Sequence, residues 1–265
     1  MKIVAIANQK GGVAKTTTAI NLAASLAEAG RKILVVDMDP QGNASTGLGV
    51  GMERRARTVY DLLLGDSDCA DVVVETSTQN LFLIPSTTEL SSSDVQLHNV
   101  NKRSFLLRDS MRSASAASLG FDYVLIDCPP SLNLLTVNAL VAADSVLIPL
   151  QSEFFALEGL SQLMLTIREI RQTANPALRV EGVLLTMHDQ RNNLSQQVEL
   201  DARETLGDLV YKTIIPRNVR LSEAPSFSVP ALSYDPTSKG ALAYRTFAQE
   251  FLSANNDRSE VTSHV

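Results

Sequence analysis

Short runs of apolar, often β-branched residues recur along this chain, and stretches with helical periodicity separate them. The runs are Lys2–Ala7, Lys32–Asp37, Leu81–Ile84, Tyr123–Asp127, Ser145–Leu150, Gly182–Thr186 and Thr213–Pro216. Runs that are apolar on both faces are typical of strands buried in a parallel sheet. Because strands that alternate with helices form right-handed βαβ units, the pattern predicts an α/β fold with one doubly wound, mostly parallel, twisted sheet flanked by helices.

The predicted helices are Thr16–Ala29, Leu134–Ala142, Leu157–Thr173, Leu194–Leu206 and Lys239–Leu252. The polar segment Gly65–Gln79 predicts a surface connection, and the serine-rich but partly apolar segment Ser86–Ser118 predicts a helix packed on the sheet. No shift in composition marks a domain boundary. We therefore expect a single domain over residues 1–254 and a polar, disordered tail over residues 255–265.

Composition limits the classes of partner. The 265 residues carry a formal net charge of −6, which argues against a protein whose whole surface coats nucleic acid but leaves room for a local basic patch. The two cysteines, Cys69 and Cys128, form no CxxC pair, so we expect a reducing cytoplasm and neither a disulfide framework nor a zinc site. The first residues lack the pattern of a signal peptide, and no membrane span is expected.

The strand Lys2–Ala7 leads into the segment NQKGGVAKTT and then into a helix. This layout binds phosphate, because the N–H groups of the loop and the positive end of the helix point at the anion. Lys15 is expected to reach the β- and γ-phosphates of ATP, and the Thr16 hydroxyl to ligate Mg²⁺. The standard pattern GxxxxGK[ST] is not matched, because Gln9 and Ala14 occupy its glycine positions.

The loop resembles the deviant Walker A pattern, KGGxxK[ST], of the P-loop NTPases of the ParA and MinD families. The resemblance implies that Lys10 and Lys15 are catalytic and that Lys10 reaches across a dimer interface to the partner's nucleotide, where a cation stabilises charge on the phosphates. Ala14 departs from the family, in which glycine is usual, and its methyl group would strain the backbone if this position needs a positive φ. The implied nucleotide-binding residues of the loop are Lys10, Gly11, Gly12, Val13, Ala14, Lys15, Thr16 and Thr17.

Carboxylates follow two other predicted strands. Asp37 and Asp39 stand in the segment DMDPQGN, and Asp127 begins the segment DCPPS. Carboxylates at the C-terminal ends of parallel strands lie in the crevice where such sheets bind ligands. Both segments resemble ParA motifs. The resemblance implies that Asp39 positions or activates the attacking water, that Asp37 orders the water shell of the metal, and that Thr16, Asp39 and Asp127 form the metal site.

The segment IPRNVRLSEAPS resembles the ParA signature PRxxxxxEAP. The resemblance implies an adenine site against the backbone of Pro216, Arg217 and Asn218, with Met187 packed nearby. It also implies DNA contacts in the C-terminal third of the chain. Arginines on phosphates give sequence-independent, salt-sensitive binding. The candidates are Arg191 and Arg220, followed by Arg217 and Lys212.

Taken together, the motifs are similar to those of a ParA/Soj-type partition ATPase from Ile3 to about Phe251. This implies a cycle in which ATP and Mg²⁺ drive homodimerisation, the dimer binds double-stranded DNA non-specifically over the nucleoid, and a ParB-like centromere-binding protein stimulates a weak basal ATPase. Four alternatives stay open: a MinD-like membrane-cycling ATPase, a ParA-like ATPase that positions a protein cluster, an iron–sulfur reductase component, and a non-catalytic scaffold.

Overall fold

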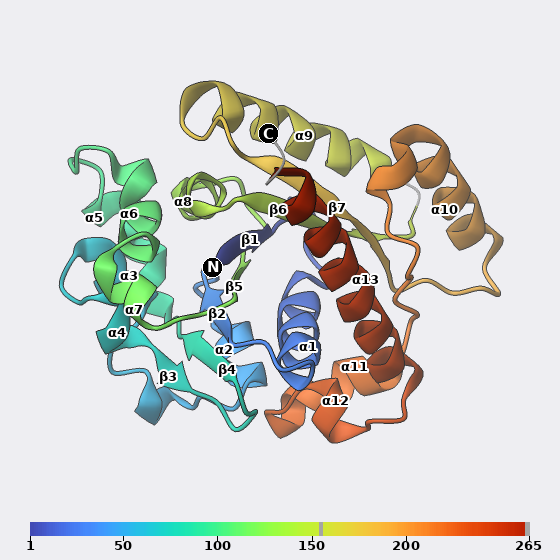
Figure 1. Ribbon diagram of the computed structural model, residues 1–265, viewed down its shortest axis with the longest axis horizontal. Coiled ribbons are helices and arrows are strands. Elements are labelled where there is room, and N and C mark those ends of the chain that lie inside the picture. Colours follow the sequence, from blue (N-terminus) through green and yellow to red (C-terminus); the bar gives the residue numbers. More distant parts are fainter. Residues whose placement is uncertain (154–155, 263–265) are drawn as a thin grey trace.

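The computed structural model describes residues 1–153 and 156–262, and a seven-stranded sheet forms its centre (Figure 1). The order of the strands is β3-β4-β2-β5-β1-β6-β7, and all neighbours pair in parallel except β3 and β4. This confirms the predicted α/β fold. The strands are β1 Lys2–Ile6, β2 Ile33–Asp37, β3 Val74–Glu75, β4 Leu81–Ile84, β5 Tyr123–Asp127, β6 Ser145–Gln151 and β7 Arg179–Thr186.

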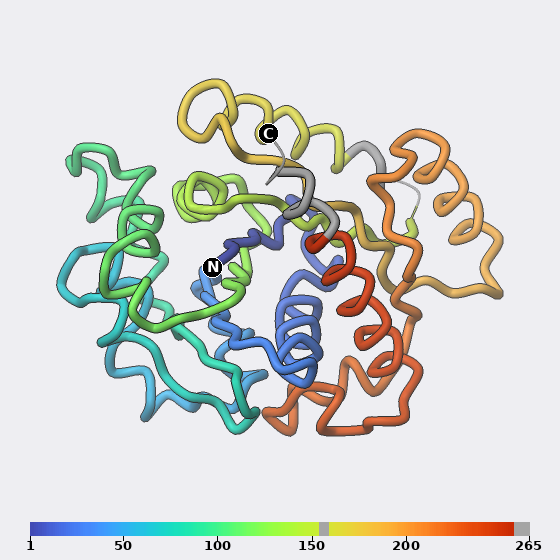
Figure 2. Tube along the Cα trace, in the orientation of Figure 1, coloured from blue at the N-terminus to red at the C-terminus, as the bar shows by residue number. Residues whose placement is uncertain are grey.

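Helices cover both faces of the sheet, and α1 and α13 lie side by side on one of them (Figure 2). The α-helices are α1 Lys15–Glu28, α2 Asn43–Gly47, α3 Val59–Leu64, α4 Cys69–Val72, α5 Ser93–Gln96, α6 Leu106–Met111, α7 Ala114–Ser118, α8 Leu134–Ala142, α9 Ala156–Thr173, α10 Asn193–Leu206, α11 Val219–Glu223, α12 Ala231–Tyr234 and α13 Lys239–Thr262.

Each sheet face has its own hydrophobic core. Along β1, Ile3 and Ala5 pack among residues of α3, α6, α8 and α9, whereas Val4 and Ile6 pack among residues of α1 and α13. Successive side chains of a strand point to opposite faces, so a strand covered on both sides must be apolar throughout. The continuous apolar runs in the sequence therefore reflect two buried faces.

The predicted strand Thr213–Pro216 is wrong. This segment forms one isolated bridge, between His188 just after β7 and Pro216, and the N–H of Ile215 donates to the carbonyl of Leu185 on β7 at 2.9 Å. The backbone N–H groups of Lys212 and Thr213 donate instead to the carboxylate of Glu250 on α13, at 2.7 and 2.9 Å. The carboxylate of Glu250 thus takes two backbone donors at the start of this segment, and the pairing with β7 does not extend into a strand.

Two further segments differ from the expectation. Ser86–Ser118 forms short helices and 3₁₀ turns, because serine hydroxyls bond nearby carbonyls and Lys102 has a φ of 58°. Gly65–Gln79 contains α4 and the two-residue strand β3, which is too short to show periodicity. Helix α13 continues to Thr262, whereas the sequence predicted its end at Leu252 and a disordered tail over residues 255–265.

The topology brings four loops to one edge of the sheet. Strand β1 pairs with β5 and β6, and β5 also pairs with β2, so the carboxyl ends of β2, β5, β1 and β6 are neighbours. In the register, Asp37 lies opposite Asp127, and Ile6 lies opposite Asp127 on the other side. The motifs that the sequence singled out therefore meet at the edge where such sheets bind ligands.

Candidate nucleotide and metal site

Hydrogen bonds within the glycine-bearing loop between β1 and α1, and to β6 and β7, fix its conformation. The side-chain amide of Asn8 donates to the carbonyl of Pro149 on β6 at 2.8 Å, and its Oδ1 accepts from the N–H of Lys10 at 3.0 Å. The hydroxyl of Thr186 at the end of β7 donates to the carbonyl of Val13 at 3.1 Å. These bonds fix the loop that the sequence predicted to cradle phosphate.

Ala14 adopts the left-handed conformation, with a φ of 67° and a ψ of 32°, and helix α1 begins directly after it. Its carbonyl accepts the first helical bond, from the N–H of Thr18 at 2.9 Å. Glycine adopts this conformation without penalty, whereas the Cβ of alanine approaches its own backbone. Position 14 thus has a positive φ, the conformation in which we expected an alanine to strain the backbone.

The two lysines of the loop differ in their surroundings. Lys15 is buried, and its ammonium donates to the carbonyl of Lys10 at 3.0 Å. Burial lowers the pKa of Lys15, and the charge of Asp127 opposes that shift. Lys10 is more exposed, and its ammonium lies 2.6 Å from a carboxylate oxygen of Glu153, the residue that the sequence did not single out.

Asp37 is fully buried and bound by the loop that follows it. One carboxylate oxygen accepts the N–H and the hydroxyl of Ser45 at 2.8 and 2.7 Å, and the other accepts the N–H of Asp39 at 3.2 Å. Burial raises the pKa of Asp37 to about 6, against the lowering effect of Ser45. Asp37 therefore fixes the conformation of this loop, whereas its place in the motif predicted a role in ordering metal-bound water.

Asp39 is only partly buried, two residues beyond the strand. One of its carboxylate oxygens accepts the N–H of Gln41 at 2.9 Å. Gly42 follows with a φ of 63°, and a Cβ at that position would lie 2.5 Å from the guanidinium of Arg55. The buried Arg55 donates to the carbonyls of Val50 and Ser86, so it holds the loop against the segment after β4.

Asp127 is also fully buried, but its environment is the opposite of that of Asp37. In the described part of the chain, neither of its carboxylate oxygens meets a donor with hydrogen-bond geometry, although Thr16 and Lys15 lie near enough to lower its pKa somewhat. Burial, followed by the charge of Asp37, raises the pKa of Asp127 well above its usual range. A hard divalent cation is the partner that such a carboxylate fits, because Mg²⁺ takes oxygen ligands and is held by one or two carboxylates together with phosphates.

No group of three or more histidine, cysteine or acidic side chains with the arrangement of a metal site occurs among residues 1–153 and 156–262. An ion at Asp127 would therefore depend on further oxygens from the nucleotide and from water. Both cysteines are buried and free, and Cys128 lies beside Asp127 with its thiol 3.8 Å from the carbonyl of Ile126.

The residues predicted for the adenine site come together. The N–H of His188 donates to the carbonyl of Ile215 at 3.1 Å, and the N–H of Arg217 donates to the carbonyl of His188 at 2.9 Å. These bonds place the end of β7, with Met187 at a φ of 52°, beside Pro216. The side chain of Asn218 caps α11 by accepting the N–H of Arg220 at 3.0 Å.

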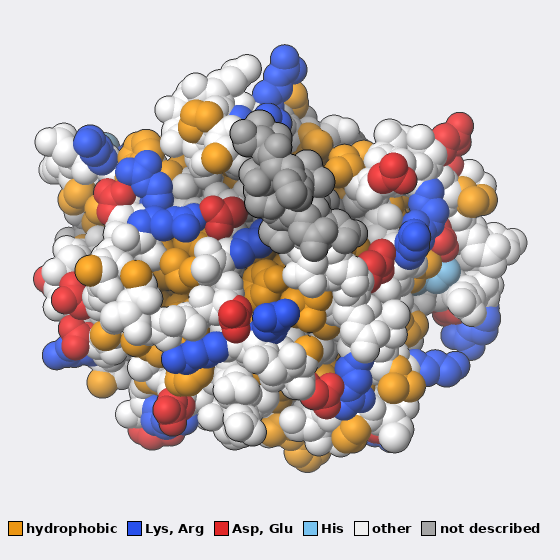
Figure 3. All heavy atoms as spheres, in the orientation of Figure 1, with side chains coloured by type: hydrophobic (Ala, Val, Ile, Leu, Met, Phe, Trp, Pro, Cys, Tyr) orange, Lys and Arg blue, Asp and Glu red, His pale blue; other side chains and the backbone are white. Residues whose placement is uncertain are grey.

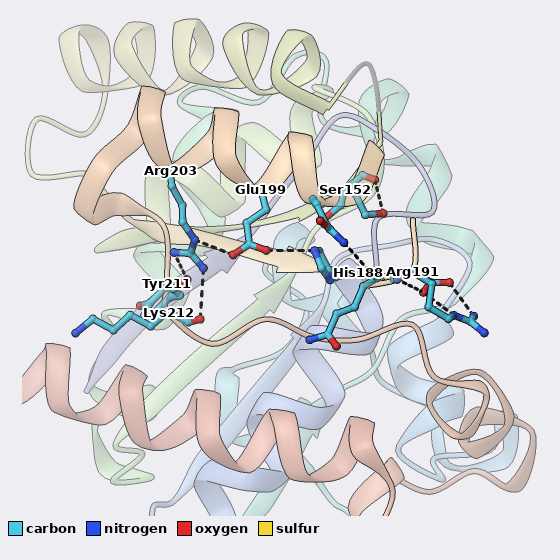
Figure 4. A network of polar contacts seen from close by, with 11 residues as sticks. Ser152, His188, Arg191, Glu199, Arg203, Tyr211 and Lys212 are labelled. Carbon is cyan, nitrogen blue, oxygen red and sulfur yellow. Dashed lines mark hydrogen bonds and ion pairs between the residues drawn. The ribbon is translucent and has the colours of Figure 1, made fainter. Parts of the chain in front are cut away.

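A cleft of about 1030 Å³ opens between this segment, α10 and the first turn of α13. Pro216, Arg217 and Arg191 line it, together with Lys239, which the sequence did not single out. Its wall contains a network that ties α10 to the loops (Figure 4): the Nε2 of the buried His188 lies 3.2 Å from Glu199, and Glu199 binds Arg203 at 3.0 Å. Neither His188 nor Glu199 belongs to a motif, so local patterns gave no signal for this contact.

The DNA-binding candidates differ in whether they already form ion pairs with acidic side chains of the same chain. Arg191 binds both carboxylate oxygens of Asp189, at 3.0 and 2.9 Å, which lowers the pKa of Asp189 to about 2. Arg220 lies 2.8 Å from Glu223 and 3.3 Å from Asp235. In the part that the structure describes, Arg217 forms no ion pair. On the face of the molecule drawn in Figure 3, basic side chains are interspersed with acidic ones and form no continuous basic patch.

Solved structures share this fold, and one of them holds an ATP analogue. A structure described as cobyrinic acid a,c-diamide synthase from Mycobacterium smegmatis, with a bound ATP analogue and magnesium, is 38% identical, with a TM-score of 0.80 over 94% of this chain and 93% of that one. The cell division ATPase MinD of Pyrococcus furiosus is 26% identical, with a TM-score of 0.79 over 95% of this chain and 98% of that one.

Sequence comparisons identify the family. Residues 1–180 match the family model described as AAA domain. The chain is 53% identical over 258 residues to the chromosome partitioning protein ParA of Caulobacter vibrioides, covering 97% of this chain and 96% of that protein. It is 51% identical over 249 residues to the sporulation initiation inhibitor protein Soj of Bacillus subtilis, covering 94% and 97%. The chain therefore belongs to the ParA/Soj family of chromosome-partitioning P-loop ATPases.

Proposed function

We propose that this chain is a nucleotide-dependent switch: with ATP and Mg²⁺ it forms a homodimer that binds double-stranded DNA without sequence preference, and hydrolysis releases it. The observation that carries the proposal is the buried carboxylate of Asp127, which meets no hydrogen-bond donor in the described residues and lies beside Lys15 and Thr16 at the end of the phosphate loop. A buried anion of this kind is stable only when a cation or donors compensate it.

The loop from Lys10 to Thr17 binds the phosphates of ATP through backbone N–H groups and Lys15. Thr16, Asp127 and Asp39 are the residues that would hold Mg²⁺, which, when bound, neutralises charge that develops on the phosphates. The base lies near Met187 and Pro216–Asn218. Two of these residues, Pro216 and Arg217, line the cleft between α10 and α13.

Asp39 positions or activates the water that attacks the terminal phosphate. It stands on a loop whose shape is fixed by Asp37 and Arg55, so a carboxylate on an otherwise exposed turn keeps a defined place. Lys10 supplies its ammonium to the nucleotide of the second subunit, which links hydrolysis to dimerisation. We expect the basal rate to be weak, because each site is complete only in the dimer.

Arg191, Arg217 and Arg220 contact DNA phosphates, and Lys239 lines the same cleft as the first two. With a net charge of −6, one chain is poorly suited to hold DNA alone. Two weak patches joined in a dimer bind much more tightly, because the second contact forms at a high effective concentration. A ParB-like centromere-binding protein stimulates hydrolysis and resets the cycle in the cytoplasm over the nucleoid.

The deciding experiment measures binding to a random-sequence DNA duplex with ATP, with ADP and without nucleotide, at low and moderate salt. We expect retention only with ATP and Mg²⁺, and a steep loss as salt rises. Equal retention in all three nucleotide states would refute the switch. Addition of vesicles in a parallel sedimentation assay addresses the MinD-like alternative. Within residues 1–153 and 156–262, no helix is both long and apolar enough to cross a membrane.

A further inference from the structure

The ammonium of Lys10 is held by a carboxylate of its own chain. Its Nζ lies 2.6 Å from Oε2 of Glu153, and the two side chains are 37% and 49% exposed. Gln151 sets the place of Glu153: its side-chain amide donates to the other carboxylate oxygen, and its backbone carbonyl accepts the N–H of Glu153 at 2.8 Å. Glu153 is thus oriented toward the phosphate loop by the end of β6.

The contact joins two neighbouring strand ends. Lys10 stands on the loop after β1, and Glu153 follows β6, the strand that pairs with β1. Lys15 does not compete for this carboxylate, because its ammonium donates to the backbone carbonyl of Lys10 instead. Among the described residues, the carboxylate of Glu153 is the one acidic group in ion-pair contact with Lys10.

One ammonium cannot serve two distant anions at once. While the ammonium of Lys10 is paired with Glu153 in its own chain, its charge is not available to the phosphates of another subunit. We propose that Glu153 is a positioning residue that holds Lys10 within the single subunit and competes with the partner's nucleotide for its charge, so that release of this ion pair is a step of ATP-driven dimerisation. The inference rests on the proposed role of Lys10 in the partner's nucleotide site.

The size of the effect follows from the exposure of the pair. Exposed ion pairs stabilise by about 0.2–1 kcal/mol, which corresponds to about 1.4- to 5.4-fold in an equilibrium constant. Two subunits lose the contact when one dimer forms, so its removal strengthens the dimer by about 2- to 30-fold, the square of the effect per subunit. Concentration-dependent sedimentation can resolve a change of this size in the dimer dissociation constant.

The experiment compares the dimer dissociation constants of the full-length protein and of Glu153→Gln with magnesium and a non-hydrolysable ATP analogue. We expect Glu153→Gln to tighten the dimer by about 2- to 30-fold, with unchanged affinity of the monomer for a fluorescent ATP analogue. Glu153→Asp keeps the charge on a shorter stem and should lie between the two. Glu204→Gln, an exposed carboxylate on α10, is the matched control for loss of one negative charge.

The double variant Lys10→Ala/Glu153→Gln separates the pair from a general charge effect. It should stay monomeric like Lys10→Ala, because there is no ammonium left to release. Restored dimers in the double variant, or a weaker dimer in Glu153→Gln, would overturn the inference. A wild-type chain that stays monomeric with ATP and Mg²⁺ would instead overturn the proposed function, whatever Glu153 does.

Discussion

The left-handed alanine in the phosphate loop allows a quantitative test. Ala14 has a φ of 67° and a ψ of 32°. An L-residue in this conformation costs about 1–2 kcal/mol, whereas glycine is nearly free of the penalty. Glycine also raises the entropy of the unfolded chain, which lowers stability by about 0.4–1 kcal/mol. The balance predicts that Ala14→Gly raises the free energy of unfolding by about 0.8 kcal/mol, within a range of about 0–1.6 kcal/mol.

Thermal and urea unfolding measure this change. For a chain of 265 residues, an unfolding entropy of about 2.1 cal/mol/K per residue turns 0.8 kcal/mol into a rise in Tm of about 1.4 °C. Ala29→Gly is the matched control, because Ala29, the C-cap residue that follows α1, has a φ of −78° and carries no such strain. There we expect a loss of about 0.4–1 kcal/mol. If Ala14→Gly destabilises the protein as much as Ala29→Gly does, the loop does not strain its alanine and the reasoning fails.

The remaining predictions concern the cycle and one buried contact. Lys10→Ala should keep monomeric ATP binding and lose ATP-dependent dimers in light scattering, whereas the control Lys102→Ala should keep both; dimers in the first variant would contradict the assigned role. Asp39→Ala should remain dimeric and bound to DNA with ATP, and undiminished phosphate release would rule it out as the water-positioning group. Arg220→Ala should bind ATP normally and lose DNA retention, so a normal gel shift at low salt would count against it. Tyr244→Phe, which removes a 3.0 Å buried hydrogen bond between α13 and α1, should lower the free energy of unfolding by about 1 kcal/mol, and an unchanged urea midpoint would show that this bond adds nothing.

The parts of the fold that follow from local pattern were predictable from the sequence. Strand β5 and the helix Leu134–Ala142 have the predicted bounds, because each is a mostly apolar, buried run that is visible within a few residues. The phosphate loop and the carboxylates Asp37 and Asp127 were predicted from short motifs that directly follow predicted strands. The order of elements along the chain was enough to bring them to one edge of the sheet.

Contacts between distant segments were not predictable. The backbone N–H of Thr213 donates to Glu250, 37 positions later, at the start of the segment where the apolar run predicted a strand. Lys10 meets Glu153, 143 positions away, and no motif marks Glu153. A single sequence shows which groups can bond, but the partner of a long side chain is decided by the tertiary fold.

The carboxylates at the sheet edge show how packing divides roles among similar residues. Asp37 and Asp127 are both fully buried and lie opposite each other in the strand register. Ser45 donates to Asp37 through its N–H and its hydroxyl, and that hydroxyl in turn accepts the N–H of Ser86 at 3.1 Å. The carboxylate of Asp37 therefore holds the loop that carries Asp39 through hydrogen bonds. The buried carboxylate of Asp127 lies beside Thr16 and Lys15 of the phosphate loop, and neither of its oxygens is held by the loop that follows β2.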